Sequence, residues 1–98
     1  MKINFAQHIT TTLGQPLMLD DKKTPATLAD VVAIALSAGG RDPLPPEESY
    51  KRGKLAQRVM AGGEIELKAE DIVLAKKAVG QHWAPGVVAP AWDALEPS

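Results

Sequence analysis

The chain contains no cysteine among its 98 residues. Without thiols it has no means of forming a disulfide bond, a thiol nucleophile or a thiolate metal site, so three classes of chemistry are excluded. The same absence is typical of proteins that work in a reducing compartment.

Excess charge of one sign and long apolar runs are also missing. The formal net charge is −1, which gives no long-range attraction to nucleic acid or to an anionic membrane surface. No apolar run approaches the roughly 20 residues that a membrane-spanning helix needs. Residues 1–12 hold one lysine and no continuous apolar stretch, so we expect no signal peptide. We therefore expect neither a nucleic acid nor a membrane as partner.

What the chain does contain is enough for one modest core. Hydrophobic residues make up 45% and charged residues 23%, a balance typical of globular domains. With this length, the composition predicts a single domain, residues 1–98. The patterns below predict a mainly α fold with a minor β part. They indicate three main helices, a short C-terminal helix and a small N-terminal β-hairpin.

The other elements are expected to pack around a core helix within residues 24–40. Its apolar residues recur at helical spacing, namely Leu28, Val31, Val32, Ala35 and Leu36. Thr27 is a suitable N-cap, and Asp30 stands three residues later in the place of the capping-box acid. Gly39 and Gly40 should end the helix, because glycine accepts a positive φ angle.

Residues 1–23 contain few helix signals. A break at Gly14–Pro16 separates two short apolar pieces, and a hairpin packed on the core helix is the simplest interpretation. Its inward residues would be Ile3, Phe5, Leu17 and Leu19. A short helix over Phe5–Leu13 is the competing interpretation, and the sequence leaves the choice open.

Two further helices are expected within residues 45–83, at Pro46–Ala61 and Ala69–Gln81. Prolines before the first of them and Gly62–Gly63 after it mark its ends. An inward stripe on this helix should consist of Tyr50, Leu55, Ala56 and Val59.

Shorter elements complete the expected fold. Glu64–Leu67 alternates polar and apolar residues, which indicates a short strand beside the hairpin or an extended entry to the next helix. Residues 84–98 should form a turn and a short helix, with Pro90 in its first turn. Trp83 and Trp92 supply the largest aromatic surfaces, and at least one should close the core.

No constellation of residues in the sequence specifies catalysis, a metal or a cofactor. The two histidines, His8 and His82, lie far apart in the sequence without a cluster of acids beside either. The HExxH and Cys/His spacings that specify zinc are missing as well. We therefore expect a protein that is not an enzyme and that needs neither metal nor cofactor.

The most concentrated charge is a basic cluster formed by Lys51, Arg52, Lys54 and Arg58. Helical spacing places three of them, Lys51, Lys54 and Arg58, on one face, with Arg52 at its flank. A solvated helix face accounts for such a cluster, and contact with an acidic protein surface is the functional interpretation. We take the four residues as the candidate partner-binding site, with the C-terminal aromatic region as a second surface.

Short features of the chain follow one another in a familiar order. They are Gly14–Leu17, Leu55–Ala56, Glu64–Leu67, Glu70–Val79, Pro85–Val88 and Trp92–Glu96. In this order they resemble a family of small accessory proteins, without assigned activity, that tailed phages and prophages encode. The resemblance implies a phage or prophage origin and a non-enzymatic role in the host bacterial cytoplasm. It carries over no active-site residue.

Two functions are compatible with these expectations. The first is a phage or prophage accessory protein that acts by non-catalytic binding of a host or phage protein, for example by inhibiting a host factor or a defence complex. The alternative is a structural or assembly component of the virion. Neither the identity of the partner nor the oligomeric state follows from the sequence.

Overall fold

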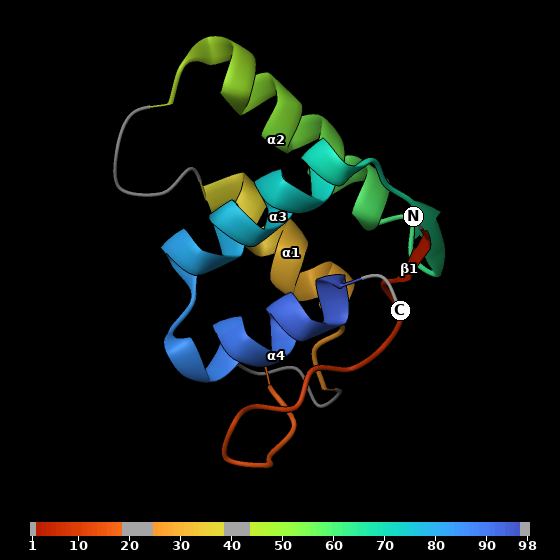
Figure 1. Ribbon diagram of the computed structural model, residues 1–98, viewed down its shortest axis with the longest axis vertical. Helices are drawn as coiled ribbons and strands as arrows, with labels where there is room; N and C mark the ends of the chain where they lie inside the picture. Colours follow the sequence, from red (N-terminus) through yellow and green to blue (C-terminus); the bar gives the residue numbers. More distant parts are fainter. Residues whose placement is uncertain (1, 19–24, 39–43, 97–98) are drawn as a thin grey trace.

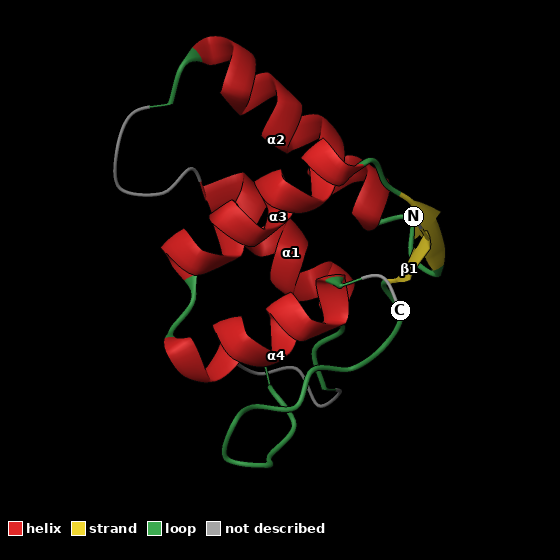
Figure 2. Ribbon diagram, in the orientation of Figure 1, coloured by secondary structure: helices red, strands yellow, loops and turns green. Residues whose placement is uncertain are grey.

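The computed structural model describes residues 2–18, 25–38 and 44–96. Helices dominate these residues, and two short strands lie together at one side of the molecule (Figure 2). In chain order the elements are β1 (Lys2–Asn4), α1 (Leu28–Ala38), α2 (Pro46–Val59), β2 (Glu64–Glu66), α3 (Ala69–His82) and α4 (Pro85–Leu95). The prediction of a mainly α fold with a minor β part is confirmed.

Helix α1 is the centre of the fold, as the sequence predicts. It is in contact with α2, α3 and α4, which surround it in Figure 1. Its start is capped by the predicted pair: the Thr27 amide donates to Asp30 Oδ2 (3.1 Å) and the Asp30 amide to Thr27 Oγ1 (3.3 Å). The expected stop at Gly39–Gly40 lies outside the described residues.

The hydrophobic core gathers side chains from every helix and from the N-terminal segment. Its fully buried large members are Phe5, Leu28, Val31, Val32, Val59, Leu67, Val79 and Leu95. Because α1 contributes apolar residues on most of its sides, it can be covered by three helices at once. No helix within the described ranges combines the length and apolar character needed to cross a bilayer.

The predicted N-terminal hairpin is wrong in its strand pairing. Strand β1 pairs antiparallel with β2, so the short strand expected within Glu64–Leu67 beside the N-terminal segment is formed and takes the place of the expected hairpin partner. The register joins Lys2 to Glu66, Ile3 to Ile65 and Asn4 to Glu64. Each strand alternates one apolar residue with two polar ones, so pairing them puts Ile3 and Ile65 on the core side together. Leu19, a predicted hairpin residue, lies outside the described residues.

The competing helix over Phe5–Leu13 is not formed either. The chain instead reverses in a tight turn, where the Gly14 amide donates to the Thr11 carbonyl (2.9 Å) and the Thr11 amide to the Gln15 carbonyl (2.8 Å). Gly14 has a φ angle of 81°, which an L-residue rarely adopts. The predicted break is therefore a real reversal, although isolated bridges, and no regular strand, flank it.

Helices α2 and α3 lie close to their predicted bounds. Helix α2 ends two residues earlier than expected, at Val59, and Gly62 and Gly63 follow with φ angles of 80° and 72°. Helix α3 extends one residue further than expected, to His82. The predicted glycine stop is confirmed, because both glycines adopt the conformation that ends a helix.

Helix α4 begins earlier than expected, because Pro85 takes the first helical position and Pro90 lies in the interior. Pro90 has no amide hydrogen to donate to the Gly86 carbonyl one turn back. The Thr12 amide donates to that carbonyl instead, at 3.1 Å. The N-terminal turn is thereby attached to α4 at the position that the proline leaves without a helical donor.

Candidate partner-binding groove

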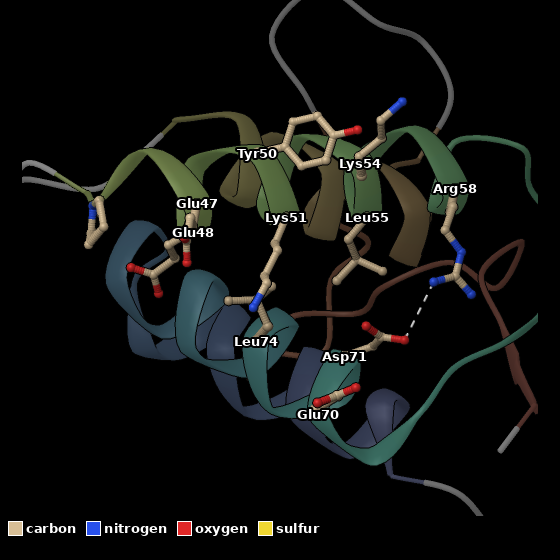
Figure 3. A pocket seen from close by; sticks show the side chains of 11 residues that line it. Glu47, Glu48, Tyr50, Lys51, Lys54, Leu55, Arg58, Glu70, Asp71 and Leu74 are labelled. Atoms are coloured by element: carbon tan, nitrogen blue, oxygen red, sulfur yellow. Dashed lines mark hydrogen bonds and ion pairs between the residues drawn. The ribbon is translucent and has the colours of Figure 1, made fainter.

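The predicted basic cluster lies on α2 beside an open groove between α2 and α3. The groove has a volume of about 630 Å³, and Figure 3 shows its lining side chains. Lys51, Lys54 and Arg58 line it, as helical spacing predicts, whereas Arg52 does not. Helices α2 and α3 both pack on α1 but touch each other little, which leaves the space between them open.

Arg52 is buried, and this corrects its predicted place at the flank of the basic face. Its side chain is 1% exposed, and its Nη2 donates to Gln81 Oε1 at 3.0 Å on α3. Glu48 Oε1 lies 3.6 Å from the same nitrogen, while Nε and Nη1 have no hydrogen-bond partner among the described residues. Arg52 therefore joins α2 to α3 through a buried side chain and does not belong to the exposed basic face.

The sequence contains a signal for this burial. Arg52 shares the inward stripe of α2 with Leu55, Ala56 and Val59, at the i, i+3, i+4, i+7 spacing. Tyr50 was expected on that stripe, but its side chain is 66% exposed. The two residues therefore exchange their expected places: the Tyr50 side chain is exposed, and the Arg52 side chain is buried on the inward stripe.

Arg58 is half exposed and is engaged with the protein itself. Its Nη2 donates to the Glu66 carbonyl (2.7 Å) and its Nη1 lies 3.4 Å from Asp71 Oδ2. The same Asp71 oxygen accepts the backbone amide of Lys68 (3.1 Å) at the start of α3. Arg58 therefore ties the end of α2 to β2 and α3, and Asp71 balances its charge.

Lys51 and Lys54 are the two exposed cations of the cluster that keep their charge available. Among the residues that the structure describes, neither forms an ion pair. Lys51 extends toward Leu74 of α3 in Figure 3, while Tyr50 and Lys54 lie on α2 at the upper rim. The Lys54 Nζ is 5.6 Å from the centre of the Tyr50 ring, within cation–π range.

The groove has an apolar floor and a charged border. Leu55 from α2 is buried, and Leu74 from α3 is half-buried, facing it across the groove. Acidic side chains lie toward the two ends, Glu47 and Glu48 at one and Glu70 and Asp71 at the other (Figure 3). Such an arrangement, with apolar surface at the centre and charge around it, is typical of protein-binding surfaces.

The two tryptophans of the C-terminal aromatic region, the second candidate surface, both make contacts within the protein, and Trp92 stays 40% exposed. Trp83 packs against the core and donates its indole Nε1–H to the Val31 carbonyl at 3.0 Å, so the prediction that a tryptophan closes the core is confirmed. Trp92 donates to the Lys76 carbonyl at 3.0 Å. Lys76 also lies over the Trp92 ring, 5.7 Å from its centre.

The histidines lie apart in the structure as in the sequence. His8 Nδ1 is 3.2 Å from the Pro25 carbonyl, and the His82 ring meets the Trp83 ring edge-on at 5.1 Å. Across residues 2–18, 25–38 and 44–96, no three His, Asp or Glu side chains gather closely enough to hold a metal ion.

Comparisons with known proteins add no relative to this picture. A scan against protein-family models and searches of curated proteins and of solved structures find no match to the chain.

Proposed function

We propose that the chain is a phage or prophage accessory protein that binds a host or phage protein without chemistry of its own, in the host cytoplasm. The α2–α3 groove carries the proposal, because Lys51, Lys54 and Tyr50 border an apolar floor and are free to meet a partner. Tyrosine at such a place is a common source of binding energy. The phage setting is supported by the resemblance of the short sequence features described above.

The lining of the groove favours a protein over a small molecule. Pockets for small ligands are lined mostly by apolar side chains and enclose the ligand. Here the groove is open, most of the residues that line it carry a charge, and the apolar ones are Pro45, Leu55, Leu74 and the ring of Tyr50. A protein surface is the better match, because it can place several charges opposite the border while covering the floor.

Affinity capture from infected host cells tests the proposal. The tagged chain is compared with a Lys51→Glu/Lys54→Glu variant and with a control of equal charge, Lys2→Glu/Lys68→Glu, neither residue of which lines the groove. We expect the wild type and the control to retain the same protein, identified by mass spectrometry, and the groove variant to lose most of it.

The identity of the retained protein separates the functional classes. A host nuclease, polymerase or defence component supports the inhibitor form of the proposal, and a capsid or tail protein supports a virion role. Equal retention by the groove variant and the control, with both folded by circular dichroism, would remove the groove as the binding site.

A further inference from the structure

We infer that the occupant of the α2–α3 groove is an acidic amphipathic helix of the partner protein. The inference rests on the proposed function and adds the secondary structure and charge of the segment that is bound. Three observations carry it: the charge that remains after internal pairing, the spacing of that charge along α2, and the apolar floor beside it.

Internal pairing removes most of the charge in the groove. Glu48 lies 3.6 Å from Arg52 and 3.5 Å from Lys77, and Asp71 lies 3.4 Å from Arg58. Lys51 and Lys54 have no such counter-charge among the described side chains; Lys51 extends toward α3 and Lys54 lies at the upper rim on α2 (Figure 3). The α2 side of the groove is therefore left with a positive charge.

Two acidic residues remain at the ends, but their positions reduce their effect. Glu47 is in the first turn of α2 and Glu70 is in the first turn of α3. The N-terminus of a helix carries about half a positive charge, which partly offsets a carboxylate in that turn. An acidic segment that lies in the groove therefore meets attraction along its α2 side and reduced repulsion at the ends.

The spacing of the lysines favours a helix as the bound segment. Lys51 and Lys54 are three residues apart on α2, and therefore about 5–6 Å apart at their Cβ atoms. Carboxylates one turn apart on a partner helix have the same spacing, so two ion pairs can form in one register. An apolar residue between those turns would face Leu55 and Leu74, with Tyr50 covering its side, as in other helix-in-groove complexes.

A labelled helical peptide tests the inference with the full chain. The probe is Ala-rich, about 15 residues long, and carries Glu residues one turn apart with Leu on the same face. A second peptide has Lys in place of each Glu, and a third has the same composition with a central Pro that breaks the helix. Binding is measured by fluorescence anisotropy at about 20 mM and at about 300 mM salt.

We expect the acidic peptide to bind in the micromolar range, and roughly tenfold more weakly at the higher salt concentration. Lys51→Glu or Lys54→Glu should weaken binding by about threefold to tenfold, whereas Lys2→Glu, with the same charge change, should have a smaller effect. Tyr50→Ala should also weaken binding. Because the Tyr50 side chain is exposed, this substitution should leave the fold intact, and loss of folding would not explain the weaker binding.

Three results would overturn the inference: no binding of the acidic peptide, equal binding of the Lys peptide, or equal binding of the Pro peptide, which would point to an extended occupant. These results are separable from the proposed function. If the infected-cell capture still depends on Lys51 and Lys54, the chain binds a protein at this groove and only the helical, acidic nature of the occupant is wrong.

Discussion

Arg52 combines a full charge with almost complete burial. It is the only buried charged side chain among the residues described, and two of its nitrogens have no hydrogen-bond partner there. An unsatisfied buried donor costs about 1–3 kcal/mol, and a charged one costs more. The contacts to Gln81 and Glu48 therefore offset only part of the free energy that burying this guanidinium requires.

Removing the hydrogen-bond partner of Arg52 should destabilise the protein more than removing the charge of Arg52 itself. We expect Gln81→Leu to lower the free energy of unfolding by about 1 kcal/mol or more, because Arg52 would stay buried with less compensation. Arg52→Met should be neutral or stabilising, because a flexible apolar side chain of similar length can fill the site. Urea denaturation followed by circular dichroism measures both.

Gln57→Leu is the matched control for the first substitution, since Gln57 is exposed on α2. If Gln81→Leu is no more destabilising than this control, the hydrogen bond to Arg52 contributes nothing to stability. If Arg52→Met is as destabilising as Gln81→Leu, the charge itself is favourable where it lies.

At the scale of the element, α2 shows how one helix divides its residues between two tasks. One face is the inward stripe that contains Arg52 and Val59, the other borders the groove with Lys51 and Lys54, and Leu55 contributes to both. Gly53 is an exposed residue in the middle of the helix, and a Cβ atom added there would meet nothing within 4 Å. The glycine therefore does not serve close packing with a neighbouring element.

Gly53→Ala should stabilise the protein, because alanine reduces the conformational entropy of the unfolded chain and favours the helix. We expect a gain of about 0.5–1 kcal/mol, which for a domain of this size raises the melting temperature by roughly 4–8 °C per kcal/mol. Gly62→Ala is the contrasting variant, because the φ angle of 80° at Gly62 strains any L-residue. Thermal unfolding in which the two variants shift in the same direction would contradict this reading of α2.

The helices of this chain could be predicted from its sequence because their signals are local. Thr27 and Asp30 form a cap within four residues, and the apolar spacing of α1 is visible in a single window. The pairing of β1 with β2 is not local. Each strand has only three residues, and nothing near Ile3 identifies Ile65 as its partner.

The candidate site could be predicted in part for the same reason. Spacing along α2 places Lys51, Lys54 and Arg58 together, but the groove also depends on Leu74 of α3, which the sequence does not bring near. Burial of Arg52 depends on Gln81, a residue of another helix. Features set by residue spacing within one helix could be predicted, whereas features that need a residue from a second helix could not.

At the scale of the whole molecule, the N-terminal segment is connected to the helices by backbone bonds. The Phe5 amide donates to the Gly63 carbonyl (2.9 Å), and the Ala29 amide donates to the Phe5 carbonyl (3.0 Å). Further along, Leu17 donates to Ile9, Ile9 to Ala26 and Ala26 to Leu17, which closes a ring of three backbone hydrogen bonds. These bonds give an irregular segment the backbone pairing that a sheet would otherwise provide.

The hydrogen bond from the Thr12 amide to the Gly86 carbonyl should couple the opening of the N-terminal turn to the opening of α4. An amide in an exposed turn would ordinarily exchange its hydrogen with solvent quickly, yet the Thr12 amide is held by the carbonyl that Pro90 leaves free in α4. Its exchange rate should therefore report when α4 separates from the turn. Trp92→Ala, which removes the indole bond to the Lys76 carbonyl, should accelerate exchange at Thr12 and at α4 amides by a similar factor, as measured by NMR. Exchange at Thr12 that stays unchanged while α4 accelerates would show that the turn and the helix open independently. If exchange at Thr12 and in α4 accelerates by the same factor, the carbonyl that Pro90 leaves without a helical donor determines how long a turn near the other end of the chain stays closed.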